Sequence, residues 1–263
     1  MNGKPYVGVT GPTKVEEVEA IVGGFDNSNY SMTSLHIPMI GFLASYKTLN
    51  REPTQNRRYP KITELSELIN VAHKKTFTMI HYNSREQQTL AEQLEKLFDG
   101  IYQDNLCRAV QLNIVYPDLY QLEVIKKRMP DLQIVFQASR RVLEENSLET
   151  ISQKIKKYES FIDYVLIDPS GGKGKEFDLE KSVQVYGELK EKIPKATIGF
   201  AGGFIGENVI PRVTTLMKTI HNSDFCIDAE GGLRDKISDV YGDDLFNAKK
   251  VGKYIGAASM VLP

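Results

Sequence analysis

Three stretches near the end of the chain each carry an apolar, strand-like run directly into a glycine-rich bend. They are Tyr164–Asp178, Ala196–Val209 and Phe225–Asp235, and helix-length segments separate them. Bends of this kind leave backbone N–H groups free to bind an anion. In a (β/α)8 barrel, the last strands build a phosphate site in this way at the C-terminal face of the sheet. The repetition therefore predicts one shared anion pocket.

The glycines of these bends are the expected ligands of the anion. Backbone amides need no particular side chain, only the absence of bulk, so binding of this kind tolerates changes in the chemistry beside it. The residues expected to present amides to a phosphate group are Gly202, Gly203, Gly231 and Gly232. Those that would let the first bend close over the ligand are Gly171, Gly172 and Gly174, with Lys173 and Lys175 either adding positive charge or simply solvated.

The composition is that of an ordinary soluble globular protein, with 41% hydrophobic and 25% charged residues. A length of 263 residues suits one barrel domain, although two smaller domains would also fit. The net charge of −1 gives no basic field for nucleic acid. No long apolar stretch and no signal-peptide pattern is present, so we expect no membrane partner and a cytoplasmic location. The oligomeric state stays open.

The two cysteines give no sign of metal or redox chemistry. Cys107 and Cys226 lie far apart in the sequence and lack the spacing of a metal site or a redox pair. Both sit inside apolar runs, which favours small, buried hydrophobic side chains over reactive thiols. We therefore expect no metal and no cofactor.

Strand-like runs and helical patterns alternate along the chain, and this order must position the glycine bends. Apolar residues at helical spacing mark the intervening helices, for example Leu65, Leu68, Ile69 and Ala72. The spacing of Thr13 with Glu16, and of Ser84 with Gln87, predicts capping boxes. The first and last helices are expected at Lys14–Val22 and Phe246–Ala258. The eight expected strands are Pro5–Thr10, His36–Ala44, Thr76–Asn83, Cys107–Asn113, Leu132–Ala138, Tyr164–Asp168, Ala196–Ala201 and Phe225–Asp228.

Eight strand and helix units in this length predict an α/β fold, a single (β/α)8 TIM barrel with a closed parallel sheet spanning residues 1–263. The polar segment Tyr46–Pro60 after the second strand is the exception to the short connections. It is too long for a routine loop, so it is either an active-site flap or a mobile insertion.

The order of motifs resembles the phosphoribosylanthranilate isomerase family, the barrel isomerases of tryptophan biosynthesis, over nearly the whole chain. The most specific block is Gly202–Val209, which resembles the family's Ala-Gly-Gly-Leu-x-Pro-Glu-Asn-Val. DPSGGKGKEFD resembles Asp followed by Gly-Gly-Thr-Gly-x-x-Phe-Asp. The remaining segments that carry the resemblance are VGVT with its following proline (Val7–Pro12), Gly41–Phe42, Arg57–Pro60, Ala109–Asn113 and IDAEGG at the last strand.

The resemblance implies an Amadori rearrangement, in which a general acid protonates the sugar ring oxygen and a general base removes a proton from C2′. It implies Asp168 as the general acid; the alternative is an aspartate that caps the following turn. The family's base is a first-strand cysteine, and Val7 stands at that position. Possible substitutes for this base are His81, His36 and Glu230, each of which also has a purely structural reading as a core histidine, a loop contact or a turn cap.

Three further positions follow from the resemblance. It implies Arg58 as the holder of a substrate carboxylate, for which the planar guanidinium is suited, unless it is a solvated loop arginine. It implies a substrate contact for Asp228, unless this aspartate caps a turn. Asn113 stands where the family often has histidine.

The sequence favours a phosphosugar-binding barrel that acts as an aldose–ketose isomerase of the Amadori type on a small phosphorylated sugar derivative. The first alternative is a catalytically inactive barrel that binds a phosphometabolite as a sensor or scaffold. A sugar-phosphate lyase or aldolase comes last, because it would need a Schiff-base lysine at a strand end and none is evident.

Overall fold

The strands close into one parallel barrel in the computed structural model, which describes residues 3–145, 147–170 and 179–263. The barrel strands are β1 (Tyr6–Thr10), β2 (Ile37–Ser45), β3 (Phe77–Asn83), β4 (Ala109–Leu112), β5 (Gln133–Ser139), β6 (Tyr164–Asp168), β7 (Thr197–Ala201) and β8 (Cys226–Ala229). Each strand pairs with the next in parallel, and β8 pairs with β1 to close the ring. The predicted (β/α)8 barrel is confirmed, and seven of the eight strands differ from their predicted bounds only by small end shifts.

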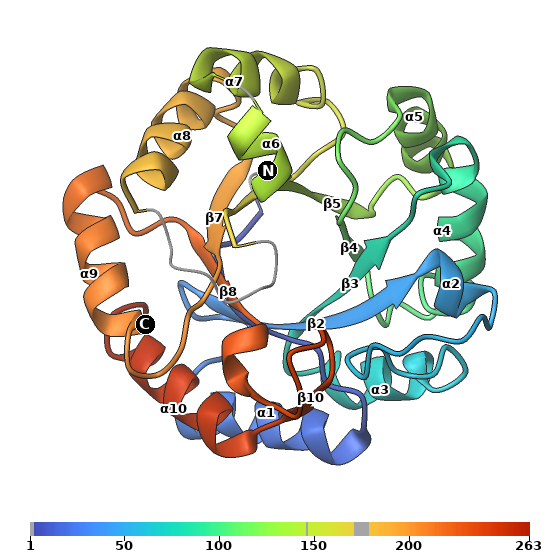
Figure 1. Ribbon diagram of the computed structural model, residues 1–263, viewed down its shortest axis with the longest axis horizontal. Helices are drawn as coiled ribbons and strands as arrows, with labels where there is room; N and C mark the ends of the chain where they lie inside the picture. The colour runs from blue at the N-terminus through green and yellow to red at the C-terminus, as the bar shows by residue number, and fades with distance from the viewer. Residues whose placement is uncertain (1–2, 146, 171–178) are drawn as a thin grey trace.

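Helices surround the barrel as a ring (Figure 1). Their apolar stripes bury against the strands; in α3, for example, Leu65, Leu68, Ile69 and Ala72 are all buried, as the spacing predicts. Within the described ranges, no helix is both long and apolar enough to cross a membrane. The helices are α1 (Val15–Asn27), α2 (Tyr46–Leu49), α3 (Leu65–Ala72), α4 (Leu90–Phe98), α5 (Leu119–Arg128), α6 (Arg140–Glu145), α7 (Leu148–Lys156), α8 (Leu179–Lys192), α9 (Val209–Ile220) and α10 (Ala248–Ser259), with 3-10 turns η1 (Gln87–Thr89) and η2 (Gly231–Leu233).

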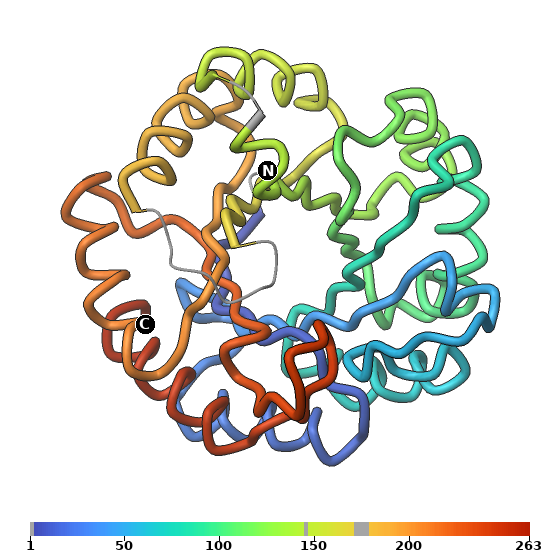
Figure 2. The backbone as a smooth tube through the Cα atoms, in the orientation of Figure 1, coloured from blue at the N-terminus to red at the C-terminus, as the bar shows by residue number. Residues whose placement is uncertain are grey.

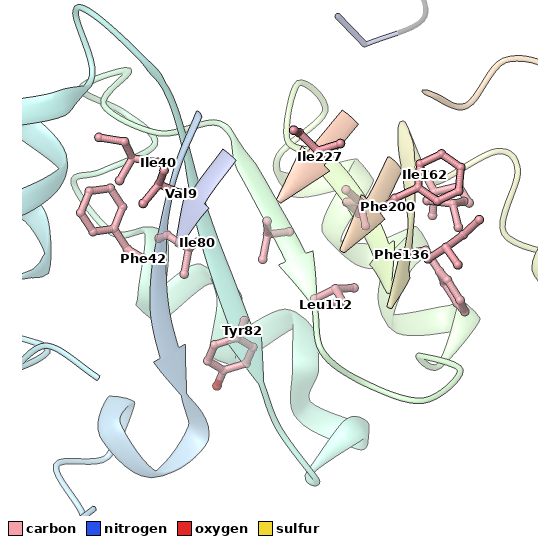
Figure 3. Close-up of a cluster of buried hydrophobic side chains, with 14 of the residues drawn as sticks. Val9, Ile40, Phe42, Ile80, Tyr82, Leu112, Phe136, Ile162, Phe200 and Ile227 are labelled. Atoms are coloured by element: carbon pink, nitrogen blue, oxygen red, sulfur yellow. The ribbon is translucent and has the colours of Figure 1, made fainter. Parts of the chain in front are cut away.

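Alternation along the strands separates an outer core from the barrel interior. In β1, Val7 and Val9 belong to the core between strands and helices, whereas Tyr6 belongs to the cluster inside the barrel. Figure 3 shows the outer core, with Val9 beside Phe42. The inward positions at the C-terminal ends of the strands are polar, which creates a polar mouth above an apolar floor.

Two helix starts differ from the predicted capping boxes. The amide of Thr13 donates to Oε2 of Glu17 at 2.7 Å, not to Glu16, and α1 begins at Val15 without a side-chain cap. Ser84 accepts from the amide of Glu86 at 3.1 Å, outside any helix N-cap. At the start of α1, the carboxylate of Glu17 accepts the hydrogen bond in place of Glu16, and at Ser84 the side chain serves a tight turn in place of a helix start. The spacing alone therefore did not determine the hydrogen-bond partner.

A hairpin after β8 is an addition to the plain barrel. Its strands β9 (Arg234–Lys236) and β10 (Asp244–Phe246) pair antiparallel between η2 and α10. In Figure 2 the end of the chain, coloured red, lies beside the blue first helix at the rim of the barrel. The long segment after β2, which begins with α2, reaches this hairpin: the amide of Arg57 donates to the carbonyl oxygen of Gly242 at 2.9 Å. The loops that follow β2 and β8 are therefore joined across the mouth beside β1.

Candidate active site

A cavity of about 320 Å3 lies at the C-terminal ends of the barrel strands. Its lining includes most of the residues that the sequence singles out, namely Asp168, Asp228, Gly202, Gly203, Gly231 and Gly232. The barrel thus gathers the ends of β6, β7 and β8 around one space, as the repeated bends predict. Gly171, Gly172, Gly174, Lys173 and Lys175 lie outside the described residues.

Asp228, at the end of β8, is a buried carboxyl group with 6% of its surface exposed. The hydroxyl of Thr10, on the neighbouring strand β1, donates to Oδ1 at 3.0 Å and Oδ2 at 3.2 Å. Burial raises the pKa of Asp228 to about 8, aided by the negative charge of Glu230 and opposed by the Thr10 hydrogen bond. Asp228 is therefore protonated at neutral pH and can donate a proton into the cavity.

Asp168, at the end of β6, is equally buried but lies among hydrogen-bond donors. Its Oδ2 accepts from Nε2 of Gln137 at 2.8 Å. Its Oδ1 accepts from the amide of Ser170 at 3.1 Å and from the Ser170 hydroxyl at 2.8 Å. Hydrogen bonds from these three donors stabilise the carboxylate form, whereas burial disfavours it. Asp168 and Asp228 thus present two carboxyl groups in contrasting environments to the same cavity.

The glycines of the second and third bends form a closely packed cradle. Gly202 and Gly203 have φ angles of 107° and 70°, a conformation that suits glycine. A Cβ on Gly232 would lie 2.5 Å from Cγ2 of Ile205 and 2.9 Å from the carbonyl oxygen of Phe204, so the two loops touch there only because position 232 lacks a side chain. Among the described residues, the amide of Gly203 has no hydrogen-bond acceptor.

The carbonyl groups of this cradle are held by side chains on and before α9. Nη1 of Arg212 donates to the carbonyl oxygens of Gly202 and Gly203 at 3.3 and 2.9 Å. Nδ2 of Asn208 donates to the carbonyl oxygen of Gly203 at 2.8 Å. Since the loop's acceptors are engaged on this side, its geometry is fixed by side chains that take no space in the cavity.

Arg58 is buried, with 4% exposure, and its donors are engaged within the protein. Nε and Nη2 contact Oδ2 of Asp244 at 3.0 and 2.6 Å, and Nη1 donates to Oε1 of Glu230 at 2.6 Å. The guanidinium also lies over the ring of Tyr241, 4.6 Å from its centre. Arg58 is thus not a solvated loop residue. Its fork already binds a carboxylate of the chain itself, where the resemblance implies one from a substrate.

Asp244 is the centre of this ion-pair cluster. Nε of Arg234 donates to its Oδ1 at 2.5 Å, opposite the contacts from Arg58. Burial raises the pKa of Asp244, but the hydrogen bonds from Arg58 and Arg234 outweigh it, so the pKa lies below its usual range. The pKa of Glu230, by contrast, is raised, because burial outweighs its attraction to Arg58. The cluster joins the segment after β2 to the hairpin after β8.

The structure separates the candidate bases that the sequence left open. His36 lies at the opposite end of the barrel, where its Nε2 contacts the carbonyl oxygen of Ser223 at 2.9 Å, so it is wrong as a base and is a core histidine. His81 lines the cavity, but burial lowers its pKa to about 3. Glu230 lines the cavity and pairs with Arg58.

Val7 is not part of this site. Its side chain faces the outer core, and the residue of β1 that reaches the mouth is Thr10. A Cβ on the intervening Gly8 would lie 2.5 Å from Cε of Met39 and 2.9 Å from Oδ1 of Asp228, which confirms that β1 turns Gly8 and Thr10 inward. Val7 therefore does not occupy a position in the cavity wall at which a catalytic base would be expected.

Several lining residues were absent from the sequence predictions, although a periodic signal for them exists. Gln111, Gln137 and Ser139 each stand two residues from another inward polar position on the same strand, which is the spacing of one strand face. Tyr241 comes from the hairpin, and nothing local in the sequence places it there. Cys107 and Cys226 are both buried, as predicted. Within the described ranges, no group of three or more His, Cys, Asp or Glu side chains is placed to hold a metal ion.

Comparison with known proteins bears on the fold. No protein-family model matches the chain, and no curated protein matches it. Among solved structures, phosphoribosyl anthranilate isomerase from Thermotoga maritima matches with a TM-score of 0.61 at 15% identity, covering 97% of this chain and 99% of that chain. A phosphoribosyl anthranilate isomerase in complex with reduced 1-(o-carboxyphenylamino)-1-deoxyribulose 5-phosphate gives 0.60 at 14% identity, with 97% and 99% covered.

An enzyme of another class matches nearly as well. The catalytic domain of a hyperthermophilic chitinase from Pyrococcus furiosus gives a TM-score of 0.59 at 11% identity, covering 99% of this chain and 96% of that chain. Because isomerase and chitinase share the architecture to a similar degree, the likeness concerns the fold and not the reaction. The chain is a (β/α)8 barrel similar in structure to phosphoribosyl anthranilate isomerases along nearly its whole length.

Proposed function

We propose that the protein is an aldose–ketose isomerase of the Amadori type, acting on a small phosphorylated sugar derivative. The observation that carries the proposal is the pair of buried carboxyl groups, Asp168 and Asp228, beside a glycine cradle in one cavity. Two titratable groups whose environments differ in this way can divide the roles of acid and base. The solved isomerase that holds a phosphorylated ligand in the same fold supports this reading.

The contrasting environments favour Asp228 as the general acid and Asp168 as the general base, the reverse of the role that the resemblance implies for Asp168. Asp228 carries its proton at neutral pH because its pKa is raised to about 8. It donates this proton to the sugar ring oxygen, which opens the ring. Asp168, held by Gln137 and Ser170, accepts the proton that leaves C2. Return of that proton to C1, with transfer of the proton of the C2 hydroxyl group to Asp228, forms the ketose carbonyl and restores both carboxyl groups without an external oxidant or reductant.

The phosphate group would lie on the amides of the cradle, which belong to the loops that follow β7 and β8 and lie beside the two carboxyl groups. The first amides of a 3-10 turn lack an acceptor within the turn, and η2 begins at Gly231. Gly203 lines the same cavity. Amides around an anion contribute partial positive charge without a charged side chain. Gly172 and Gly174, which would close over this end, remain predictions from the sequence.

The test is turnover of phosphoribosylanthranilate and of a panel of aldose phosphates by the purified protein, measured as formation of the ketose product. We expect Asp168→Asn and Asp228→Asn each to lower kcat by about 10²–10⁴-fold with little change in KM, because general acid–base catalysis contributes factors of that size. The wild-type kcat should fall as the pH rises through about 8, where Asp228 loses its proton.

The same experiment separates an enzyme from a binding protein. If phosphate esters bind and this binding is lost in Gly202→Asp, yet none of the aldose phosphates turns over, the protein is a sensor or scaffold. If turnover is seen but survives both aspartate substitutions, the roles assigned to Asp168 and Asp228 are wrong.

A further inference from the structure

The wall of the cavity formed by strands β3, β4 and β5 carries six neutral polar side chains. They are His81, Asn83, Gln111, Asn113, Gln137 and Ser139, and we call this set the β3–β5 wall. In the barrel order this wall stands across from β7 and β8, whose loops carry the glycine cradle. His81 belongs with the neutral residues, because burial lowers its pKa to about 3. The cavity therefore has an anion-binding side at the glycine cradle and a neutral polar side at the β3–β5 wall.

Three atoms of the β3–β5 wall are buried without a hydrogen-bond partner among the described residues. They are Nε2 of His81, Oε1 of Gln111 and Oγ of Ser139. His81 and Gln111 are each only 2% exposed. Buried polar atoms in folded proteins are nearly always hydrogen-bonded, and leaving one unpaired costs about 1–3 kcal/mol. A buried atom without a partner also occurs away from the cavity, at Oε1 of Gln133, but on this wall three of them border one cavity, where a ligand can supply the partners.

Neighbouring hydrogen bonds fix which groups face the cavity. Nε2 of Gln111 donates to Oδ1 of Asn113 at 2.8 Å, which leaves the carbonyl oxygen of Gln111 as an acceptor. Nε2 of Gln137 donates to Asp168 at 2.8 Å, which ties the wall to the carboxylate of β6. The wall thus offers the carbonyl oxygen of Gln111 as an acceptor and the hydroxyl group of Ser139, a pattern that pairs with groups that both donate and accept.

The described surroundings of the wall disfavour two other classes of ligand. Among the described residues that line the cavity there is no lysine or arginine, whereas Asp168 and Glu230 are both acidic. Among the described residues, a carboxylate on the ligand would meet these acidic groups without a lysine or arginine free to pair with it, since Arg58 is engaged by Asp244 and Glu230. A flat aromatic group could lie against Tyr241, Leu166 or Ala201, but it would leave the polar atoms of the wall unpaired.

We propose that the β3–β5 wall recognises a neutral polyhydroxyl group, so that the substrate is a sugar phosphate whose second half carries hydroxyls and not an aromatic carboxylate. This rests on the proposed function in one respect only, the placing of the phosphate at the cradle. Gln111 is the central specificity-determining residue, with Ser139 and His81 on the neighbouring strands.

The test is isothermal titration calorimetry of the purified protein at pH 7 with four probes: ribose 5-phosphate, pentyl phosphate, ribose and inorganic phosphate. We expect ribose 5-phosphate to bind at least 10-fold more tightly than pentyl phosphate, which has the same number of carbon atoms and no hydroxyls. Gln111→Leu should reduce this ratio at least 5-fold while leaving the affinity for inorganic phosphate unchanged. Ser139→Ala, a smaller change that keeps the fold, should reduce the ratio in the same direction.

Gln133→Leu is the matched control. Its Oε1 is also buried without a partner among the described residues, and it lies on β5, but it does not line the cavity. It should leave every affinity unchanged. Equal binding of pentyl phosphate and ribose 5-phosphate, or a ratio unaffected by both Gln111→Leu and Ser139→Ala, would overturn the proposal. If ribose binds and its phosphate binds no tighter, the wall stands and the phosphate site of the proposed function fails.

Discussion

Thr10 and Asp228 join the first and last strands of the barrel inside its mouth, with the hydroxyl of Thr10 donating to both carboxyl oxygens at 3.0 and 3.2 Å. This contact opposes the rise in the pKa of Asp228 that burial causes. It therefore links the closure of the sheet to the protonation state of the group that we propose as the acid.

Replacing Thr10 with valine should raise the pKa of Asp228 above its value of about 8, because the donor that stabilises the carboxylate is lost. The loss of stability should be about 1 kcal/mol, as for one buried hydrogen bond. Carbon-13 NMR titration of the aspartate carboxyl signals measures the shift. Thr78→Val is the control, since the Thr78 hydroxyl donates to the carbonyl oxygen of Leu106 instead. An unchanged Asp228 titration in Thr10→Val would contradict the prediction.

Asp228 should make the folded protein less stable as the pH rises from 5 to 8. In the unfolded chain this group ionises near pH 4, but in the folded protein it keeps its proton up to about 8. The folded state binds one more proton across that interval. The free energy of unfolding therefore falls by up to about 1.4 kcal/mol per pH unit, and the stabilisation is complete only below pH 4.

Urea unfolding of the wild type and of Asp228→Asn at pH 5, 6, 7 and 8 measures this term. The variant should be less sensitive to pH over the interval, because asparagine does not titrate. Parallel curves for the two proteins would show that Asp228 ionises at its ordinary pH in the folded state.

The two adjacent arginines of the segment after β2 should differ sharply in their contribution to stability. Arg58→Met removes one cation from the buried cluster around Asp244 and should cost on the order of 3 kcal/mol. Arg57→Met removes an exposed ion pair with Asp243, in which the arginine side chain is 58% exposed, and should cost about 0–1 kcal/mol. Chemical denaturation measures both. Equal losses would mean that the Asp244 cluster adds nothing beyond a surface pair.

Gly232→Ala should push the loop after β7 away from the loop after β8. The added Cβ would meet Cγ2 of Ile205 at 2.5 Å and a backbone oxygen at 2.9 Å, which predicts a loss of about 1–3 kcal/mol and weaker binding of phosphate. Gly252→Ala in α10 has open space around the new methyl group and should stabilise the helix by about 0.5–1 kcal/mol. Thermal unfolding and phosphate titration distinguish the two variants. Unaltered phosphate binding in Gly232→Ala would remove that glycine from the cradle.

Local periodicity was enough to predict the barrel, because the pattern of each strand and each helical stripe lies within a few consecutive residues. Tyr164–Asp168 was predicted with its observed bounds for that reason. The hairpin after β8 was not predicted, since its strands have three residues each and mostly polar side chains. The partner of Arg58 lies 186 positions along the chain at Asp244, and no local pattern joins two such residues.

The order of motifs also did not show on which face of its strand a residue lies. Matching VGVT to a family pattern drew attention to Val7, whereas alternation from the buried Tyr6 would have pointed to Gly8 and Thr10. The same alternation would have indicated Gln111 and Gln137 as inward polar residues. Distances between the carboxyl groups and their donors, by contrast, arise only when the sheet closes.

The alternation of inward and outward residues along β1 also limits how this protein could acquire new chemistry. Of its five residues, only Tyr6, Gly8 and Thr10 face inward, and Tyr6 is packed at the apolar floor. Gly8 has no room for a side chain beside Met39 and Asp228. A catalytic group contributed by the first strand could therefore arise by mutation of a single codon, that of Thr10. Any such mutation would at once change the ionisation of Asp228.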